Sequence, residues 1–202
     1  MYKLPIGIRI PSHDEYPSGY DIDKLDSERA SANIVEGYRI DEVHNNKFTY
    51  FAEINIDADK IWDLYIKLTR ALIPERAYGL IAFKDAEHEL SDFADRERVL
   101  GLFADYKYEL TNDGYLEFGI AHYDDISLNE VLVKSFKYLQ VWISNRDKFI
   151  SVMNEFGLLQ YNNLQFIDEF PVVSESLTNI IPQGTRHYSL VIEEIKKKFM
   201  DF

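Results

Sequence analysis

Residues 47–61 have the sequence KFTYFAEINIDADKI, and this stretch decides the fold. Apolar and aromatic side chains occupy every second position of 48–56, an alternation that predicts a β-strand with one buried face. Asp57 can cap a helix, and hydrophobic residues then recur at helical spacing until Pro74 ends the pattern. The stretch therefore predicts a strand followed directly by a helix over 58–73.

A second stretch matches the first at an offset of 88 residues. Phe48–Phe51 aligns with Phe136–Leu139, Asp59–Ile61 aligns with Asp147–Phe149, and the match holds four identities. It predicts a tandem repeat of one strand–helix unit, with chance convergence as the alternative. The predicted units are about 47–73 and 135–158, inside pseudo-repeat halves of about 34–111 and 115–202 in a single domain, 1–202.

The rest of the chain alternates between the two kinds of pattern. Residues 11–33 are polar, which predicts a long loop with one helical turn near 24–32. Other segments predict strands over 3–10, 34–40, 78–83, 115–123, 131–143 and 164–173, and helices over 92–111 and 188–202. We therefore expect an α+β fold, with an antiparallel or mixed sheet and helices mainly on one face.

The composition limits the function. With 202 residues, of which 46% are hydrophobic, the chain can bury a sizeable core. Its 35 acidic residues against 22 basic ones give a net charge of -13, which repels nucleic acid and anionic membranes. A basic protein partner is favoured, although acidity that serves only solubility is the alternative.

The chain has no cysteine, which excludes disulfides, thiolate metal sites and a cysteine nucleophile. No apolar run approaches the roughly 20 residues of a membrane helix, and the first residues lack the pattern of a secretory signal. We expect a cytoplasmic protein that does not enter a membrane. Its oligomeric state stays open.

No catalytic or cofactor motif is present. The chain has no P-loop, dinucleotide-binding glycine pattern, nucleophile elbow or EF-hand loop. His88-Glu89 suggests a zinc protease motif, but position 92 is Asp rather than the second His. We therefore expect no cofactor and no metal.

Carboxylates gather after two predicted strands. One group follows 78–83, and a second pair follows 115–123. Such groups can attract a basic partner, although a solvated helix start and a turn are the plainer explanations. The predicted binding residues are Asp85, Glu87, Glu89, Asp92, Asp95, Asp124 and Asp125.

An enzymatic or ligand-binding alternative places a pocket between the two repeat halves. Glu53 and His122 are its acid–base candidates, with Tyr50 and Tyr138 as pocket walls. His122 falls on the apolar face of its strand, so a hydrogen-bonded core histidine is the competing interpretation.

The combined character is small, acidic, cysteine-free and rich in tyrosine, with 14 Tyr residues. In this general character the chain resembles bacterial immunity proteins that inhibit nuclease toxins, although it carries no motif of such a family. The resemblance implies a non-catalytic binding protein. Carboxylates would steer the encounter with a basic toxin, and buried Tyr or Trp anchors would hold the complex.

Overall fold

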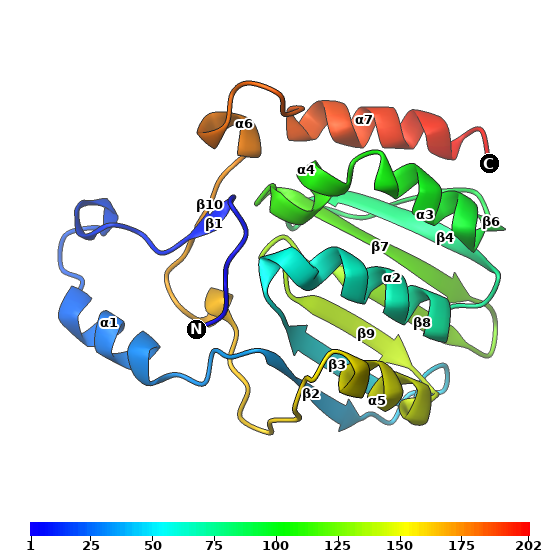
Figure 1. Ribbon diagram of the computed structural model, residues 1–202, viewed down its shortest axis with the longest axis horizontal. Coiled ribbons are helices and arrows are strands. Elements are labelled where there is room, and N and C mark those ends of the chain that lie inside the picture. Colours follow the sequence, from blue (N-terminus) through cyan, green and yellow to red (C-terminus); the bar gives the residue numbers. More distant parts are fainter.

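The computed structural model describes all 202 residues and contains one eight-stranded sheet (Figure 1). Every pair of neighbouring strands is antiparallel, in agreement with the prediction of an antiparallel or mixed sheet. In spatial order the strands are β2 (Gly37–Glu42), β3 (Tyr50–Asn55), β9 (Leu139–Ile143), β8 (Leu128–Val133), β7 (Leu116–Tyr123), β4 (Arg76–Phe83) and β5 (Glu89–Leu90), and β6 (Ala94–Asp95) also pairs with β4.

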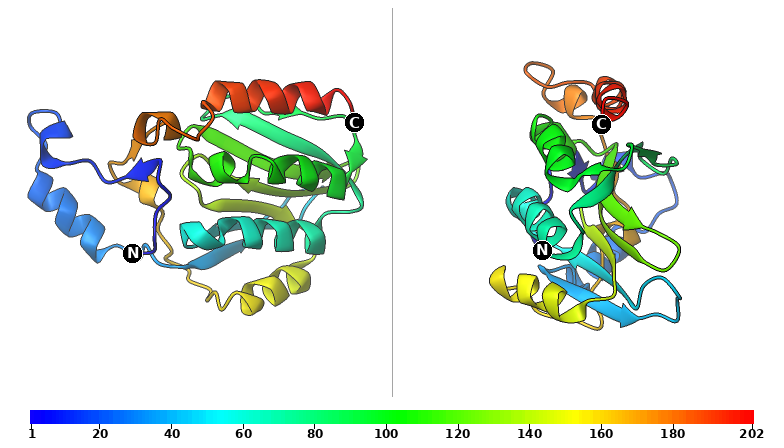
Figure 2. Two further views of the ribbon diagram at one scale, coloured as in Figure 1. Left: turned by 45° about the horizontal axis from the view of Figure 1, so that its top comes forward. Right: turned by 90° about the vertical axis from the view of Figure 1, so that its right-hand side faces the viewer.

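Helices cover one face of this sheet, and the other face carries none (Figure 2). The covering helices are α2 (Ile61–Leu72), α3 (Arg96–Ala104), α4 (Lys107–Asn112), α5 (Arg146–Glu155) and α7 (Tyr188–Phe199). This arrangement confirms the predicted α+β class with helices mainly on one face. No helix is both long and apolar enough to cross a bilayer.

The remaining elements lie beside the sheet. β1 (Ile8–Arg9) and β10 (Val173–Ser174) form a separate two-stranded ladder, and α6 (Leu177–Ile180) follows it. α1 (Ile22–Ser31) stands away from the sheet at the left of Figure 1. The predicted single turn near 24–32 is therefore too short, because Asp21 caps a ten-residue helix by accepting a bond from the Lys24 amide at 3.1 Å.

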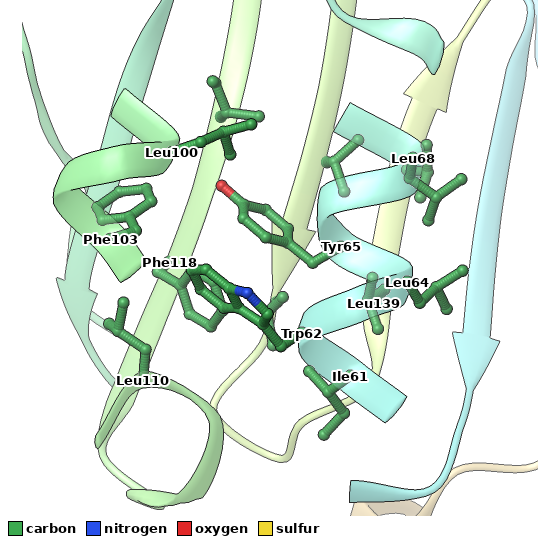
Figure 3. Close-up of a cluster of buried hydrophobic side chains, with 14 of the residues drawn as sticks. Ile61, Trp62, Leu64, Tyr65, Leu68, Leu100, Phe103, Leu110, Phe118 and Leu139 are labelled. Carbon is green, nitrogen blue, oxygen red and sulfur yellow. The ribbon is translucent and has the colours of Figure 1, made fainter. Parts of the chain in front are cut away.

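The core fills the space between the helices and the sheet (Figure 3). Phe118 of β7 lies at its centre, and its ring centroid is 4.9 Å from Tyr65, 5.8 Å from Phe103 and 6.3 Å from Trp62. Burial of these large apolar surfaces, from strand and helices alike, is the main force that holds the layers together.

The prediction of one long strand over 131–143 is wrong, because the chain makes a hairpin there. β8 ends at Val133, the chain turns, and β9 begins at Leu139. Lys137 takes a φ of 64°, and its amide donates to the Lys134 carbonyl at 2.9 Å. The turn contains no Gly, Asn or Pro, so the sequence lacks the usual signal for it.

Three further boundaries differ from the predictions. The strand predicted over 3–10 is only two residues long, and most of 164–173 is irregular apart from a short 3₁₀ turn and the start of β10. The helix predicted over 92–111 is divided, because β6 precedes it and α3 ends before α4 begins. Asp95 fixes the later start by capping α3 through the Arg98 amide at 3.1 Å.

Both repeat units do contain a strand followed by a helix, and β3 and β9 are neighbours. The helices agree with the 88-residue alignment, since Ile61 and Phe149 are both fully buried. The strands do not, because Ile54 faces the helices whereas Trp142 faces the opposite side. The proposed halves also interleave: β9, β8 and β7 lie between β3 and β4 in the sheet.

Candidate functional site

Two pairs of aromatic side chains lie on the helix-free face of the sheet, on either side of Glu130 and Ala121. The strand register places Asp41, Phe51, Trp142, Glu130, Ala121 and Tyr78 side by side, and alternation turns them all away from the helices. The rings of Phe51 and Trp142 are 5.0 Å apart, and Tyr78 stacks on Tyr123 at 4.6 Å. We call Phe51, Trp142, Tyr78 and Tyr123 the aromatic row.

The aromatic row remains open to solvent. Phe51, Trp142 and Tyr78 are half-buried, and Tyr123 is 41% exposed. Ile126, in the turn after β7, is 80% exposed. The two aromatic pairs are separated by Glu130 and Ala121, and exposed aromatic surface gathered on one face in this way marks an interaction site more often than scattered single residues do.

Negative charge lies within and around the aromatic row. Glu130 sits between Trp142 and Ala121 in the register, and its carboxylate accepts no hydrogen bond within the chain. Burial raises the pKa of Glu130, and the nearby side chains of His88 and Lys134 only partly oppose this. Asp41 is exposed at the β2 end of the line.

Two cations near this face are already paired with buried carboxylates. Arg39 Nε donates to Glu53 Oε2 at 2.6 Å, and Lys134 Nζ donates to Glu117 Oε2 at 2.8 Å. His88 Nε2 also lies 3.4 Å from Glu117. Burial alone would raise the pKa of Glu117, but His88 and Lys134 outweigh it and lower that pKa to about 2.

A small cavity of about 220 Å³ adjoins the aromatic row. Its lining residues are Arg39, Glu53, Tyr138, Phe166, Asp168 and Glu169. The Tyr138 hydroxyl donates to Asp168 Oδ2 at 3.3 Å, and Gln140 Nε2 donates to Glu53 Oε1 at 3.0 Å. Burial raises the pKa of both Tyr138 and Asp168.

Lys137 is the least expected charged group, because the turn folds its side chain into the protein. The residue is 1% exposed, and Nζ donates to the Leu116 carbonyl. Burial lowers the pKa of Lys137 to about 7, although Asp113 and Glu117 oppose the shift.

The buried Lys137 predicts a pH dependence of stability. Between about pH 7 and 10.5 the unfolded lysine still carries its proton whereas the folded one has lost it, so stability rises with pH. The slope from this group approaches about 1.4 kcal/mol per pH unit. Urea denaturation at several pH values should show this rise for the wild type. The rise in stability with pH should be absent from Lys137→Met. It should persist in Lys148→Met, the control, because Lys148 is exposed. Equal slopes of stability against pH in all three proteins would contradict the prediction.

The structure spreads the predicted acidic binding residues over two ends of the sheet. Asp85 follows the end of β4 that pairs with Leu116, whereas Asp124 follows the other end of β7, about 23 Å away by strand rise. Asp124 and Asp125 lie next to Tyr123 and so adjoin the aromatic row. Asp85, Glu87, Glu89, Asp92 and Asp95 instead follow the β4–β5–β6 edge.

Several of these carboxylates also have partners within the chain. Glu89 pairs with Lys196 at 2.6 Å. Asp95 caps α3. Asp124 holds its turn by accepting the Ile126 amide at 2.9 Å and the Ser127 amide at 2.7 Å, and these hydrogen bonds lower its pKa.

The alternative acid–base pair is not assembled. Glu53 lies on β3 and His122 on β7, with β9 and β8 between them, a lateral distance of about 14 Å to which the register adds an offset of three residues along the strands. His122 Nδ1 lies 2.8 Å from the Arg76 carbonyl, as expected for a histidine held by the backbone. Of the two predicted pocket walls, Tyr138 lines the small cavity with Glu53, whereas Tyr50 packs against the main core.

Two larger cavities, of about 630 and 700 Å³, open on the helix side and share Trp62. Their charged side chains largely pair with one another, as in Arg70–Glu97 and Lys3–Asp59. No group of three or more His, Asp or Glu side chains has a geometry suited to a metal ion.

The fold and the site define an acidic α+β protein with one antiparallel sheet, a helical layer on one face and an aromatic, carboxylate-flanked surface on the other. No family model matches the chain, and comparisons with curated protein sequences and with solved structures also find no match.

Proposed function

We propose that this chain is a non-catalytic, cytoplasmic binding protein that holds a basic protein partner against its helix-free face. One observation carries the proposal: an open aromatic row with Glu130 between its two pairs of rings and with Asp41, Asp124 and Asp125 at its flanks. An inhibitor of a nuclease toxin, in the manner of bacterial immunity proteins, is the kind of protein that this surface would suit.

The surface combines two parts that tight protein complexes use. Trp and Tyr side chains at the centre of an interface supply large, rigid apolar area and most of the binding energy. Charged groups at the rim contribute more to the rate of encounter and to partner choice. Arg39 and Lys134 are paired with Glu53 and Glu117. Near the aromatic row the four carboxylates of Asp41, Asp124, Asp125 and Glu130 therefore outnumber the two cations that no carboxylate holds, Arg76 and Lys47.

The test uses a partner captured on the immobilised protein from cell extract and then purified. The expected partner is basic, and its association rate falls by about tenfold or more as salt is raised. The variant Asp41→Asn/Asp125→Asn/Glu130→Gln should slow association further. Asp14→Asn/Asp23→Asn/Asp63→Asn removes the same charge elsewhere and should have a smaller effect. Equal effects of the two variants on association, or an association rate that does not depend on salt concentration, would contradict the proposal.

A small-molecule site or a carboxylate-based enzyme is the second candidate. One observation favours it: Glu53 is only 7% exposed and lines a cavity with Tyr138. Both carboxylate oxygens of Glu53 are nevertheless held, one by Arg39 and one by Gln140, which leaves Glu53 poorly placed to exchange protons with a substrate.

A further inference from the structure

The small cavity beside the aromatic row carries a more specific inference, which rests on the proposed function. We propose that the cavity lined by Arg39, Glu53, Tyr138, Phe166, Asp168 and Glu169 receives one arginine side chain of the basic partner. Its aromatic walls and surplus carboxylates together form a receptor for a guanidinium group.

The position of the cavity agrees with this role. Glu53 lies two residues after Phe51 on the same face of β3, and Gln140 lies two residues before Trp142 on β9. Two strand residues span about 7 Å. A partner seated on the aromatic row therefore has the cavity within reach of one long side chain.

The charge of the cavity also favours a cation. Three carboxylates and one guanidinium line it, and that guanidinium is already bound to Glu53. Asp168 accepts one bond from Tyr138, and Glu169 Oε1 accepts the Phe166 amide at 2.9 Å. An ionised carboxylate offers about four acceptor positions, so both retain capacity for further donors.

The aromatic walls favour arginine over lysine. The buried Phe166 ring already holds one guanidinium of the chain itself: the guanidinium carbon of Arg39 is 4.9 Å from its centre, and the Tyr138 ring is 4.7 Å away. A partner guanidinium would therefore lie against the Arg39 plane and the accessible edges of these rings. A guanidinium is planar and weakly hydrated, stacks on rings and can bond two carboxylate oxygens at once. An ammonium is more strongly hydrated and loses more on entering such a cavity.

The test titrates the isotope-labelled protein with N-acetyl-L-arginine amide and follows its amide resonances by NMR. Saturable shifts are expected at the residues that line the cavity, with a dissociation constant of about 1 mM. N-acetyl-L-lysine amide should bind more weakly. N-acetyl-L-citrulline amide, which has a similar shape without the charge, should bind at least about tenfold more weakly.

Variants locate the binding. Asp168→Asn and Glu169→Gln keep the side-chain shapes, and each should weaken arginine amide by about tenfold while the spectrum remains that of a folded protein. Asp147→Asn, at the exposed start of α5, is the matched control and should leave binding unchanged. Absence of saturable shifts, equal binding of the citrulline compound, or equal effects of Asp147→Asn and Asp168→Asn would overturn the proposal.

The partner assay separates this inference from the proposed function. If arginine amide does not bind but the captured partner still needs Trp142, the cavity inference fails and the proposed function stands. If arginine amide binds through Asp168 but no partner depends on the aromatic row, the cavity remains a guanidinium site and the proposed function fails.

Discussion

Phe118→Ala should lower the free energy of unfolding by about 3–5 kcal/mol, the usual cost of removing a fully buried aromatic ring. Phe118 has no exposed surface and contacts rings from both α2 and α3, so its loss leaves a cavity at the junction of the sheet and the helical layer. Tyr65 and Trp62 are fixed on α2 by their own packing and cannot fully collapse into the space (Figure 3).

Urea denaturation, followed by far-UV circular dichroism, measures this loss. Phe83→Ala provides the control, because Phe83 is 41% exposed on β4 and its removal should cost about 1 kcal/mol or less. If Phe118→Ala proved no more destabilising than Phe83→Ala, the centre of the core would lie elsewhere.

The fold class could be predicted because its signals are local. Alternation over 48–56 specifies β3, and Pro74 ends the helical pattern within two residues of the end of α2. The hairpin between β8 and β9 could not be predicted in the same way. In its turn Lys137 adopts a positive φ, a conformation that Gly or Asn would signal in the sequence and that a lysine does not.

The same limit applies to the candidate site. Phe51 and Trp142 are adjacent only because β3 pairs with β9, and that pairing is not encoded in either strand alone. A signal did exist, since Phe51 interrupts the polar positions of its strand with a large aromatic ring. An aromatic residue on the polar face of a strand is therefore the sequence signal for an exposed aromatic surface such as this one.

Closeness in sequence does not place the carboxylates close together in this sheet. Asp85 and Asp95 are only ten residues apart, but β4, β5 and β6 carry them to opposite ends of the sheet. Glu117 and Lys134 show the reverse, because strand pairing brings them together at 2.8 Å from 17 residues apart. In an antiparallel sheet the register, rather than the spacing along the chain, decides which charges act together.

Trp142→Ala should weaken binding of the captured partner by about 30- to 100-fold, as expected for removal of a central aromatic anchor. Most of the change should appear as faster dissociation, because the carboxylates to which the proposed function assigns the steering of association remain. The free energy of unfolding should fall by only about 1 kcal/mol, since Trp142 is half-buried and loses mainly its contact with Phe51.

Surface plasmon resonance with the purified partner measures both rates. Tyr108→Ala is the matched control: Tyr108 is an aromatic residue that is 46% exposed on α4, on the helix side, and its removal should leave both rates unchanged. Because the two substitutions differ chiefly in the face of the sheet that they alter, their comparison assigns the partner to one face. Loss of binding in Tyr108→Ala with normal binding in Trp142→Ala would place the interface on the helical layer instead.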